Sequence, residues 1–257
     1  NGEEVISLSA TGQTVRAYAV RAAVADDAGA FAVCAAPGAQ LNPDIDGVDV
    51  VWEDWRDGQA DIYHFCRTNM VTVRLTSLPG NERQPAVWGG LVAWVDNRNG
   101  NDDIYACWLT GGTAFAVCTN EAAQARPDVC AGLIVWEEYR NGNSDIFAFD
   151  LSNQVESCIT SNIWPQFRPR VSDAWAVWED WRSDTGDADI MAWNRAERAE
   201  HAVSTAERNQ NAPSVYRDRF AWMSDEDEEW AIYAAFPADA FSINNGGMLT
   251  KTPFVTL

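Results

Sequence analysis

Apolar and polar residues alternate in short stretches along most of the chain, and five of these stretches are centred on a tryptophan. They are Val50–Asp54, Val92–Asp96, Ile134–Glu138, Ala176–Asp180 and Phe220–Ser224. Turn residues such as Gly, Asn and Asp interrupt the pattern every 8 to 12 residues or so, roughly the spacing of short strands in all-β proteins. A period of two with many β-branched residues predicts strands rather than helices.

The stretches belong to a repeat of about 42 residues. Their tryptophans, Trp52, Trp94, Trp136, Trp178 and Trp222, are 42, 42, 42 and 44 residues apart. A proline precedes each by nine residues: Pro43, Pro85, Pro127, Pro169 and Pro213. A second signature, Asp-Ile-Tyr or a variant, follows each tryptophan and begins at Asp61, Asp103, Asp145, Asp189 and, without the aspartate, Ala231.

Each repeat has room for four strands. In the copy that starts at Pro85 we expect them near Ala86–Val87, Leu91–Val95, Asp103–Leu109 and Thr113–Thr119. A four-stranded unit of about 40–45 residues that repeats radially is the blade of a β-propeller. The chain is therefore predicted to be all-β.

The two ends of the chain contain parts of one further repeat. Phe31–Cys34 and Gln40–Pro43 match Phe115–Cys118 and Gln124–Pro127, while Pro253–Leu257 resembles the start of a new copy. We expect the C-terminal strand to close the ring, because closure removes exposed sheet edges. The prediction is one domain, 1–257, a six-bladed propeller of four-stranded antiparallel blades with approximate repeats 1–42, 43–84, 85–126, 127–168, 169–212 and 213–257. Five blades plus an N-terminal flap is the alternative.

The repeated motif resembles the TolB-like family of propeller repeats. The shared pattern is Pro-x-Val-x-Gly, Val-Trp-x-Asp-x-Arg-x-Gly-x-x-Asp-Ile-Tyr and a closing Leu-Thr, and five copies of it cover residues 43–250. The resemblance implies a secreted, periplasmic or cell-surface location. Similar blades serve as protein-docking platforms, glycan-associated surface modules and accessory domains of hydrolases, so the resemblance does not select a function.

The charge of the chain argues against a nucleic-acid partner, and its hydropathy argues against membrane insertion. The chain has 18 basic and 38 acidic residues, a formal net charge of -20, which repels a nucleic-acid backbone. It has no apolar run of the roughly 18 residues that a membrane span needs, so no membrane insertion is expected. A closed propeller needs no second copy, and we expect a monomer.

The six cysteines leave two interpretations open. Cys107 and Cys118 flank the turn of one predicted hairpin, which favours a cross-strand disulfide. Alternatively, the cysteines are free thiols that behave as small buried hydrophobic side chains. Because no C-x-x-C pair is present, zinc is disfavoured.

The repeated polar residues have a structural explanation. We expect each repeat tryptophan to pack against a neighbouring blade. Asp54 and Arg56, their counterparts in the next three repeats, and the aspartates that begin the second signature are expected to form salt bridges or to cap turns. No cofactor is expected, although the repeated aspartates leave calcium open.

Side chains that vary between repeats are the better candidates for binding, because variable loops on a constant scaffold usually carry function. The hairpins between second and third strands and the connections between blades are expected on the same face of a propeller. The hairpins contribute Trp55, Asn97, Tyr139, Trp181 and Asp225, and the connections contribute Arg83, Arg126, Trp164, Phe167 and Arg168. Our candidate ligand-binding set is Trp55, Tyr139, Trp181, Arg83, Arg126, Trp164 and Arg168. The alternative is that Trp55 and Trp181 only cover neighbouring arginine stems.

The sequence favours a binding role over catalysis. It contains no G-x-S-x-G, H-E-x-x-H or Walker motif and only two histidines, and no catalytic residue is assigned. The first hypothesis is a non-enzymatic module that recognises a glycan or a protein. The others are a carbohydrate-active enzyme, a lyase or glycosidase with carboxylates in the central funnel, and a structural propeller within a larger surface protein. The acidic stretch 225–229 could pair carboxylates for glycosidase chemistry, and its alternative is a solvated hairpin.

Overall fold

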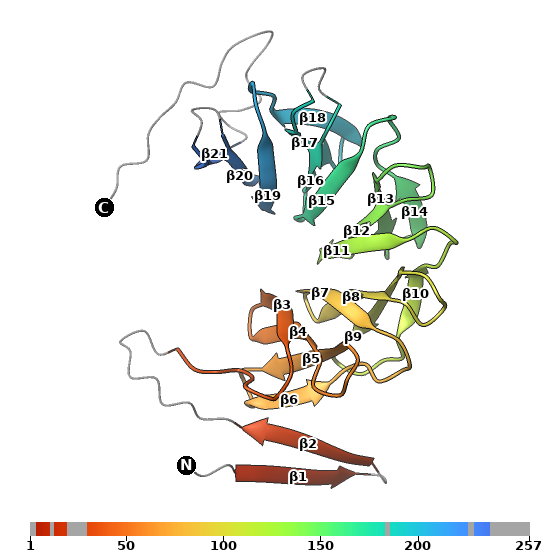
Figure 1. The fold of residues 1–257 in the computed structure, drawn as a ribbon, viewed down its shortest axis with the longest axis vertical. Helices are drawn as coiled ribbons and strands as arrows, with labels where there is room; N and C mark the ends of the chain where they lie inside the picture. Colours follow the sequence, from red (N-terminus) through yellow and green to blue (C-terminus); the bar gives the residue numbers. More distant parts are fainter. Residues whose placement is uncertain (1–3, 11–12, 20–29, 183–185, 226–228, 237–257) are drawn as a thin grey trace. The chain divides into compact units, whose positions relative to one another are not determined.

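The computed structural model describes residues 4–10, 13–19, 30–182, 186–225 and 229–236 (Figure 1). The chain divides into two compact units, Asn1–Ile163 and Trp164–Leu257. Within the described ranges the regular structure consists of 21 β-strands. No helix in the described part of the chain has the length and apolar character needed to span a membrane. The all-β prediction is confirmed.

The first unit contains one hairpin and three four-stranded sheets. The hairpin pairs β1 (Glu4–Ala10) with β2 (Gln13–Ala19). The sheets are β3 (Gln40–Asp46), β4 (Asp49–Asp54), β5 (Asp61–Cys66) and β6 (Val71–Arg74); β7 (Glu82–Trp88), β8 (Leu91–Asp96), β9 (Asp103–Trp108) and β10 (Phe115–Cys118); and β11 (Gln124–Cys130), β12 (Leu133–Glu138), β13 (Asp145–Asp150) and β14 (Val155–Cys158).

The second unit contains two further sheets. The first has β15 (Gln166–Val171), β16 (Trp175–Asp180), β17 (Asp189–Asn194) and β18 (Ala199–Ser204), and the second has β19 (Gln210–Tyr216), β20 (Arg219–Ser224) and β21 (Ala231–Ala235). In both units each strand pairs antiparallel with the next one along the chain, which is the topology of a propeller blade.

The number of blades is not settled by the described residues. They contain five sheets with blade topology, one per copy of the tryptophan motif. The predicted closing strand, Pro253–Leu257, lies outside the described residues. Six blades, and the alternative of five blades with an N-terminal flap, therefore both stay predictions.

Residues 31–39 nevertheless occupy the place that the repeat predicts for them. Arg56 Nη2 lies 3.1 Å from Cys34 Sγ, as Arg140 Nη2 lies 3.3 Å from Cys118 Sγ two repeats later. The backbone N–H of Trp55 donates to the carbonyl of Ala39 (2.9 Å), and Tyr139 donates to the carbonyl of Ala123 in the same way. This segment thus contacts its sheet as the end of a preceding blade does.

The repeated proline lies inside the first strand of each sheet, not at its start. In the sheet that contains Pro85, β7 begins at Glu82, three residues earlier than the repeat boundary suggested. The reason is a β-bulge: the strand register shifts between Arg83 and Ala86, and Gln84 has a φ of 53°. Proline has no N–H to donate, and a bulge is one of the few places in a sheet that tolerates this.

The same bulge recurs in every sheet. The residue before each proline has positive φ, and we call these five positions the bulge residues: Asn42, Gln84, Arg126, Arg168 and Ala212. The second and third strands of each sheet follow the prediction closely, since β8 and β9 span Leu91–Asp96 and Asp103–Trp108. The alternating pattern was clear there, whereas the bulge interrupts it in the first strand.

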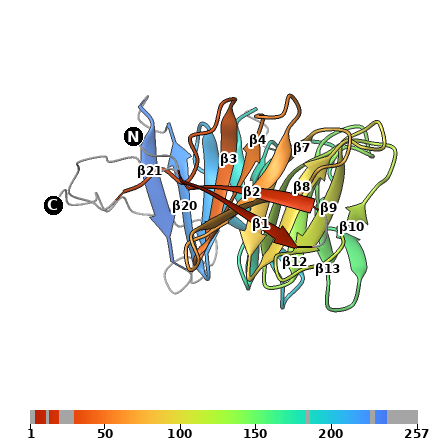
Figure 2. The ribbon, with the colours of Figure 1, turned by 90° about the horizontal axis from the view of Figure 1, so that it is seen from below.

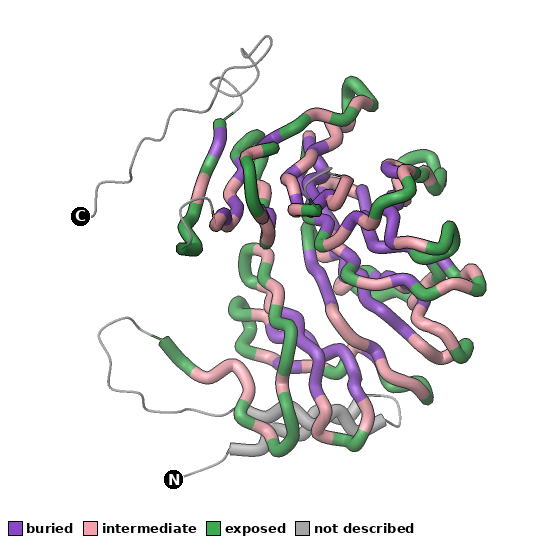
Figure 3. Tube along the Cα trace, turned by 45° about the horizontal axis from the view of Figure 1, so that its top comes forward, coloured by how far each residue is buried: buried purple, intermediate pink, exposed green. Residues whose placement is uncertain are grey.

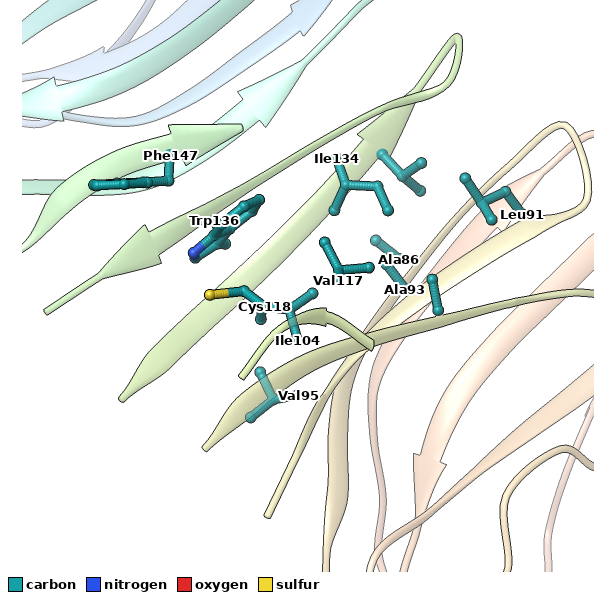
Figure 4. Close-up of a cluster of buried hydrophobic side chains, with 12 residues drawn as sticks. Ala86, Leu91, Ala93, Val95, Ile104, Val117, Cys118, Ile134, Trp136 and Phe147 are labelled. Atoms are coloured by element: carbon teal, nitrogen blue, oxygen red, sulfur yellow. The ribbon is translucent and has the colours of Figure 1, made fainter. Parts of the chain in front are cut away.

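The central strands of each sheet are buried, while the hairpins at both ends are exposed (Figure 3). In the first unit the sheet of β7–β10 lies beside the sheet of β11–β14 (Figures 1 and 2). Their facing side chains form one cluster in which Trp136 packs with Val95, Ile104 and Phe147 (Figure 4). Trp136 is fully buried. It therefore packs toward the preceding sheet, as predicted.

The predicted disulfide between Cys107 and Cys118 is not supported. Both thiols are free, as are the other four. In the β9–β10 ladder Cys118 is paired with Ile104, which is three residues from Cys107 and so about 10 Å away along the strand. Disulfide geometry requires Cα atoms within roughly 7 Å. The two cysteines lie on opposite strands but in the wrong register.

Candidate functional site

The repeated aspartate and arginine form a buried structural network. Asp54 accepts hydrogen bonds from the indole N–H of Trp52 (2.9 Å) and from the backbone N–H and Nε of Arg56 (3.0 and 2.9 Å). The Arg56 guanidinium stacks over the ring of Tyr63, 4.1 Å from its centroid. Burial by itself raises the pKa of Asp54, but the bonds from Arg56 and Trp52 outweigh it and lower the pKa below its ordinary value.

The same network recurs three times. Arg98 binds Asp96 and stacks over Tyr105, Arg140 binds Glu138 and stacks over Phe147, and Arg182 binds Asp180. In these copies too, the carboxylate accepts hydrogen bonds from the arginine and from the indole N–H of the repeat tryptophan. These contacts stabilise the sheet. Among the described residues no cluster of three or more His, Cys, Asp or Glu side chains is placed to hold a metal ion.

The fifth copy departs from this network in a way that explains its divergent motif. Ser224 stands where the other copies have Asp or Glu, and the buried Nε1 of Trp222 has no hydrogen-bond partner among the described residues. A serine side chain is too short to replace the carboxylate.

A second set of buried carboxylates lies beside the bulge residues. Glu53 accepts hydrogen bonds from Asn42 Nδ2 (2.8 Å), from Trp55 Nε1 (2.8 Å) and from the backbone N–H of Gln84 in the next sheet (3.1 Å). Its side chain is buried, although no other residue neutralises it by an ion pair within the described part of the first unit. The indole of Trp55 is therefore tied to the scaffold and only half exposed.

Glu137 is held in the same manner with different partners. Arg126 Nη1 lies 2.9 and 3.0 Å from its two oxygens, and the Tyr139 hydroxyl donates to it at 2.9 Å. Burial and then the charge of Glu137 raise the pKa of Tyr139. The Arg126 side chain stays 47% exposed, so its remaining N–H groups face solvent. In the second unit Arg168 pairs with Glu179 at 2.9 Å.

The predicted clustering of hairpins with connections is confirmed within the first unit. A side-chain amide of each hairpin donates to a backbone carbonyl of the connection to the next sheet: Gln59 to Leu78 (2.8 Å), Asn101 to Asn120 (2.9 Å) and Asn143 to Asn162 (3.0 Å). We call this side of each unit, where hairpins and connections emerge together, the loop face.

The seven candidate residues divide between the two units. Trp55, Arg83, Arg126 and Tyr139 belong to the first unit, and Trp164, Arg168 and Trp181 to the second. Arg83 is ion-paired with Asp102 (2.7 Å), and Tyr139 is 38% exposed. Trp164 is 51% exposed, whereas Trp181 is half-buried and its Nε1 has no partner in the described residues. Whether these side chains bind a ligand stays a prediction.

The structure adds a loop-face residue that the sequence reasoning missed. Ile163 is 84% exposed and borders a pocket of about 480 Å³ with Asn141, Asn143 and Ser161. The other repeats have Pro79, Glu121 and Glu207 at its position. The sequence does contain a signal for Ile163, because the repeat has glutamate or proline at this position in those other copies.

The sequence matches no protein-family model and no curated protein sequence. Several solved structures share the fold. TolB from Acinetobacter baumannii superposes with a TM-score of 0.55 and 12% identity, over 86% of this chain and 60% of that one. The putative TolB from Agrobacterium tumefaciens gives 0.54 and 16%, over 90% and 86%, and a nidogen/laminin complex gives 0.57 and 13%, over 93% and 91%.

These likenesses establish the fold of the chain as a TolB-like β-propeller, in agreement with the repeated motif. The chain spans 60% of the length of the Acinetobacter protein.

Proposed function

We propose that this TolB-like β-propeller is a non-enzymatic binding module, located outside the cytoplasm, that holds a protein partner against the loop face of its first unit. The observation that carries the proposal is the exposure of anchor-type side chains there. Ile163, on the loop face of the first unit, is 84% exposed. Large apolar side chains in this state are typical of the central residues of protein interfaces.

The polar residues of the loop face suit the same role. Arg126 and Tyr139 are fixed by Glu137, so they offer a guanidinium and a phenol ring in set positions. Side chains that are already ordered lose little conformational entropy on binding. Arginine and tyrosine are also among the residues that contribute most to interface energy.

The comparisons support protein recognition in general terms. One of the similar structures is a complex of nidogen with laminin, and propellers of this kind have a constant scaffold with variable loops. The extracytoplasmic location rests on the resemblance to TolB-like repeats. Fractionation of the producing cells tests it, and recovery of the chain only from the cytoplasm would contradict it.

The binding test uses the immobilised chain to capture proteins from the envelope and secreted fractions of its source. A captured protein is then purified and titrated against the wild type, Ile163→Ser and Arg126→Gln. We expect each substitution to weaken binding at least tenfold, because Ile163→Ser removes an exposed apolar side chain and Arg126→Gln removes the guanidinium that Glu137 holds in place. Equal affinities for all three chains would contradict the assignment of this face.

A glycan array, probed with calcium and again with chelator, completes the test. A saturable glycan that is lost in Ile163→Ser and Arg126→Gln would replace the protein by a carbohydrate as the ligand of the loop face. Calcium dependence of that signal would assign a metal to the site.

A further inference from the structure

Two exposed tryptophans flank one buried leucine at the end of the second sheet, away from the loop face. Trp88 ends β7, Leu91 begins β8 and Trp108 ends β9. The strand ladders pair Trp88 with Leu91 and Leu91 with Trp108. Side chains of directly paired residues point to the same face of a sheet, so the three form one row.

The row has a buried centre and exposed ends. Leu91 is fully buried, whereas Trp88 is 40% and Trp108 44% exposed. Since the tryptophans are two strands apart, their Cα atoms are separated by about 10 Å. Neither indole N–H donates to an acceptor among the described residues, so both donors are available at the surface.

Glycines lie close to both tryptophans in the chain. Gly89 and Gly90 follow Trp88, and Gly111 and Gly112 follow shortly after Trp108. Positive φ values of 57°, 79° and 102° at Gly89, Gly90 and Gly111 account for glycine at those turns. As a consequence, the turns that follow the two tryptophans carry no side chains at these positions. The carboxylate of Asp46, which accepts the N–H of Gly89 at 2.6 Å, brings a hydrogen-bond acceptor to this border.

The fold does not demand aromatic residues at these positions. In three other repeats the pair corresponding to Trp88 and Trp108 is Asp46 with Cys66, Cys130 with Asp150, and Ser172 with Asn194. Only the last repeat has a second aromatic pair, Tyr216 and Phe236, which lie 128 residues further along (216 − 88 and 236 − 108). Tyr216 and Phe236 are likewise exposed, at 66% and 46%.

We propose that Trp88 and Trp108 form a stacking platform for a neutral oligosaccharide. The C–H face of a pyranose ring packs on an indole, and two indoles at this separation match alternate residues of an extended sugar chain. The indole N–H groups and the Asp46 carboxylate provide a donor and an acceptor for sugar hydroxyls. Because the chain has a net charge of -20, it repels acidic polysaccharides and favours neutral ones.

A protein occupant fits this surface less well. Interface anchors usually stand within a ring of further side chains that exclude water. Here glycines follow both tryptophans in the chain, and the Asp46 carboxylate lies beside one of these turns. This platform is separate from the loop face, and the inference does not depend on the proposed protein partner.

Affinity electrophoresis tests the platform. The intact chain is run in native gels containing hydroxyethyl cellulose, galactomannan or laminarin, with alginate as the acidic polysaccharide. We expect retardation by at least one neutral polymer and none by alginate. Trp88→Ala and Trp108→Ala should each weaken the affinity at least tenfold, the double variant should migrate as in a polymer-free gel, and Trp108→Tyr should keep part of the retardation.

Two control measurements make the outcome unambiguous. Circular dichroism of each variant reports whether the exposed substitutions leave the fold intact. The loop-face variant Ile163→Ser should be retarded like the wild type, so that failure of the loop-face proposal and failure of this one are distinguished. No retardation in any neutral gel, or unchanged retardation of the folded double variant, would overturn the proposal.

Discussion

The side-chain carbonyl of Gln84 accepts a hydrogen bond from the backbone N–H of Arg126, which occupies the same bulge one repeat later (2.9 Å). At two other bulges a glutamate plays this part: Glu53 accepts from the N–H of Gln84 and Glu179 from that of Ala212. In the second sheet Val95 occupies the position of these glutamates, and the side chain of the bulge residue Gln84 accepts the hydrogen bond instead. The contact between bulges is retained although the acceptor changes.

Replacing this acceptor should loosen the junction between the second and third sheets. We expect Gln84→Met to lower the free energy of unfolding by about 1 kcal/mol, because the Arg126 N–H loses its partner without a change in side-chain volume. Urea unfolding measures it. Gln154→Met is the matched control, since Gln154 also has positive φ (56°) and its exposed side chain makes no hydrogen bond among the described residues. An equal loss of stability in both variants would refute the role of the contact.

Glu82 should make stability fall as the pH rises. It stands where the other sheets have glutamine, is fully buried opposite Asp96, and neither of its oxygens has a hydrogen-bond partner among the described residues. Burial, and next the charge of Asp96, raise the pKa of Glu82 from 4.5 to about 8. The folded chain therefore holds a proton that the unfolded chain releases, and stability is lost between these two pH values.

Glu82→Gln removes this dependence by restoring the glutamine of the other repeats. We expect the variant to be more stable than the wild type by on the order of 4 kcal/mol at pH 8, with the difference vanishing below about pH 4.5. Thermal melts across this range measure the difference. Gln124→Glu, which places a carboxylate opposite Glu138, should have the reverse effect. A wild-type advantage at pH 8 would show that the Glu82 carboxylate is stabilised by a partner.

Arg98→Lys should lower the stability of the fold although it conserves the charge. The Arg98 guanidinium binds Asp96 through Nε and Nη2 and covers the ring of Tyr105 at 4.2 Å. A lysine ammonium cannot make both nitrogen contacts and stack, so we expect a loss of about 1–2 kcal/mol in the free energy of unfolding. Arg67→Lys at an exposed turn should change stability by less than about 0.5 kcal/mol. Similar effects at the two sites would contradict the structural role of the network.

All six cysteines should be free thiols. A colorimetric thiol titration in denaturant, without reductant, should detect all of them, whereas a cross-strand disulfide would leave four. In the folded chain at pH 8 the thiol of Cys118 should react very slowly, because burial raises its pKa to about 12 and little thiolate is present. Rapid modification of Cys118 in the folded chain would show that its position is exposed.

The sequence by itself determined the strands, their antiparallel order and the burial of the repeat tryptophans. Strand periodicity is local, and a residue such as Trp136 that recurs every repeat must satisfy the same packing each time. The role of Asp54 and Arg56 was also foreseeable, because they are two residues apart and contact each other within one turn.

Tertiary structure alone decided the features that depend on register and on contacts between sheets. The bulge before each proline shifts the strand register, and the alternation of apolar and polar residues does not predict this shift. The register of β9 with β10 likewise separates Cys107 from Cys118. The Trp88–Leu91–Trp108 row required knowing which residues pair across three strands. Such relationships join residues far apart in the chain through backbone hydrogen bonds, and only the folded sheet brings them together.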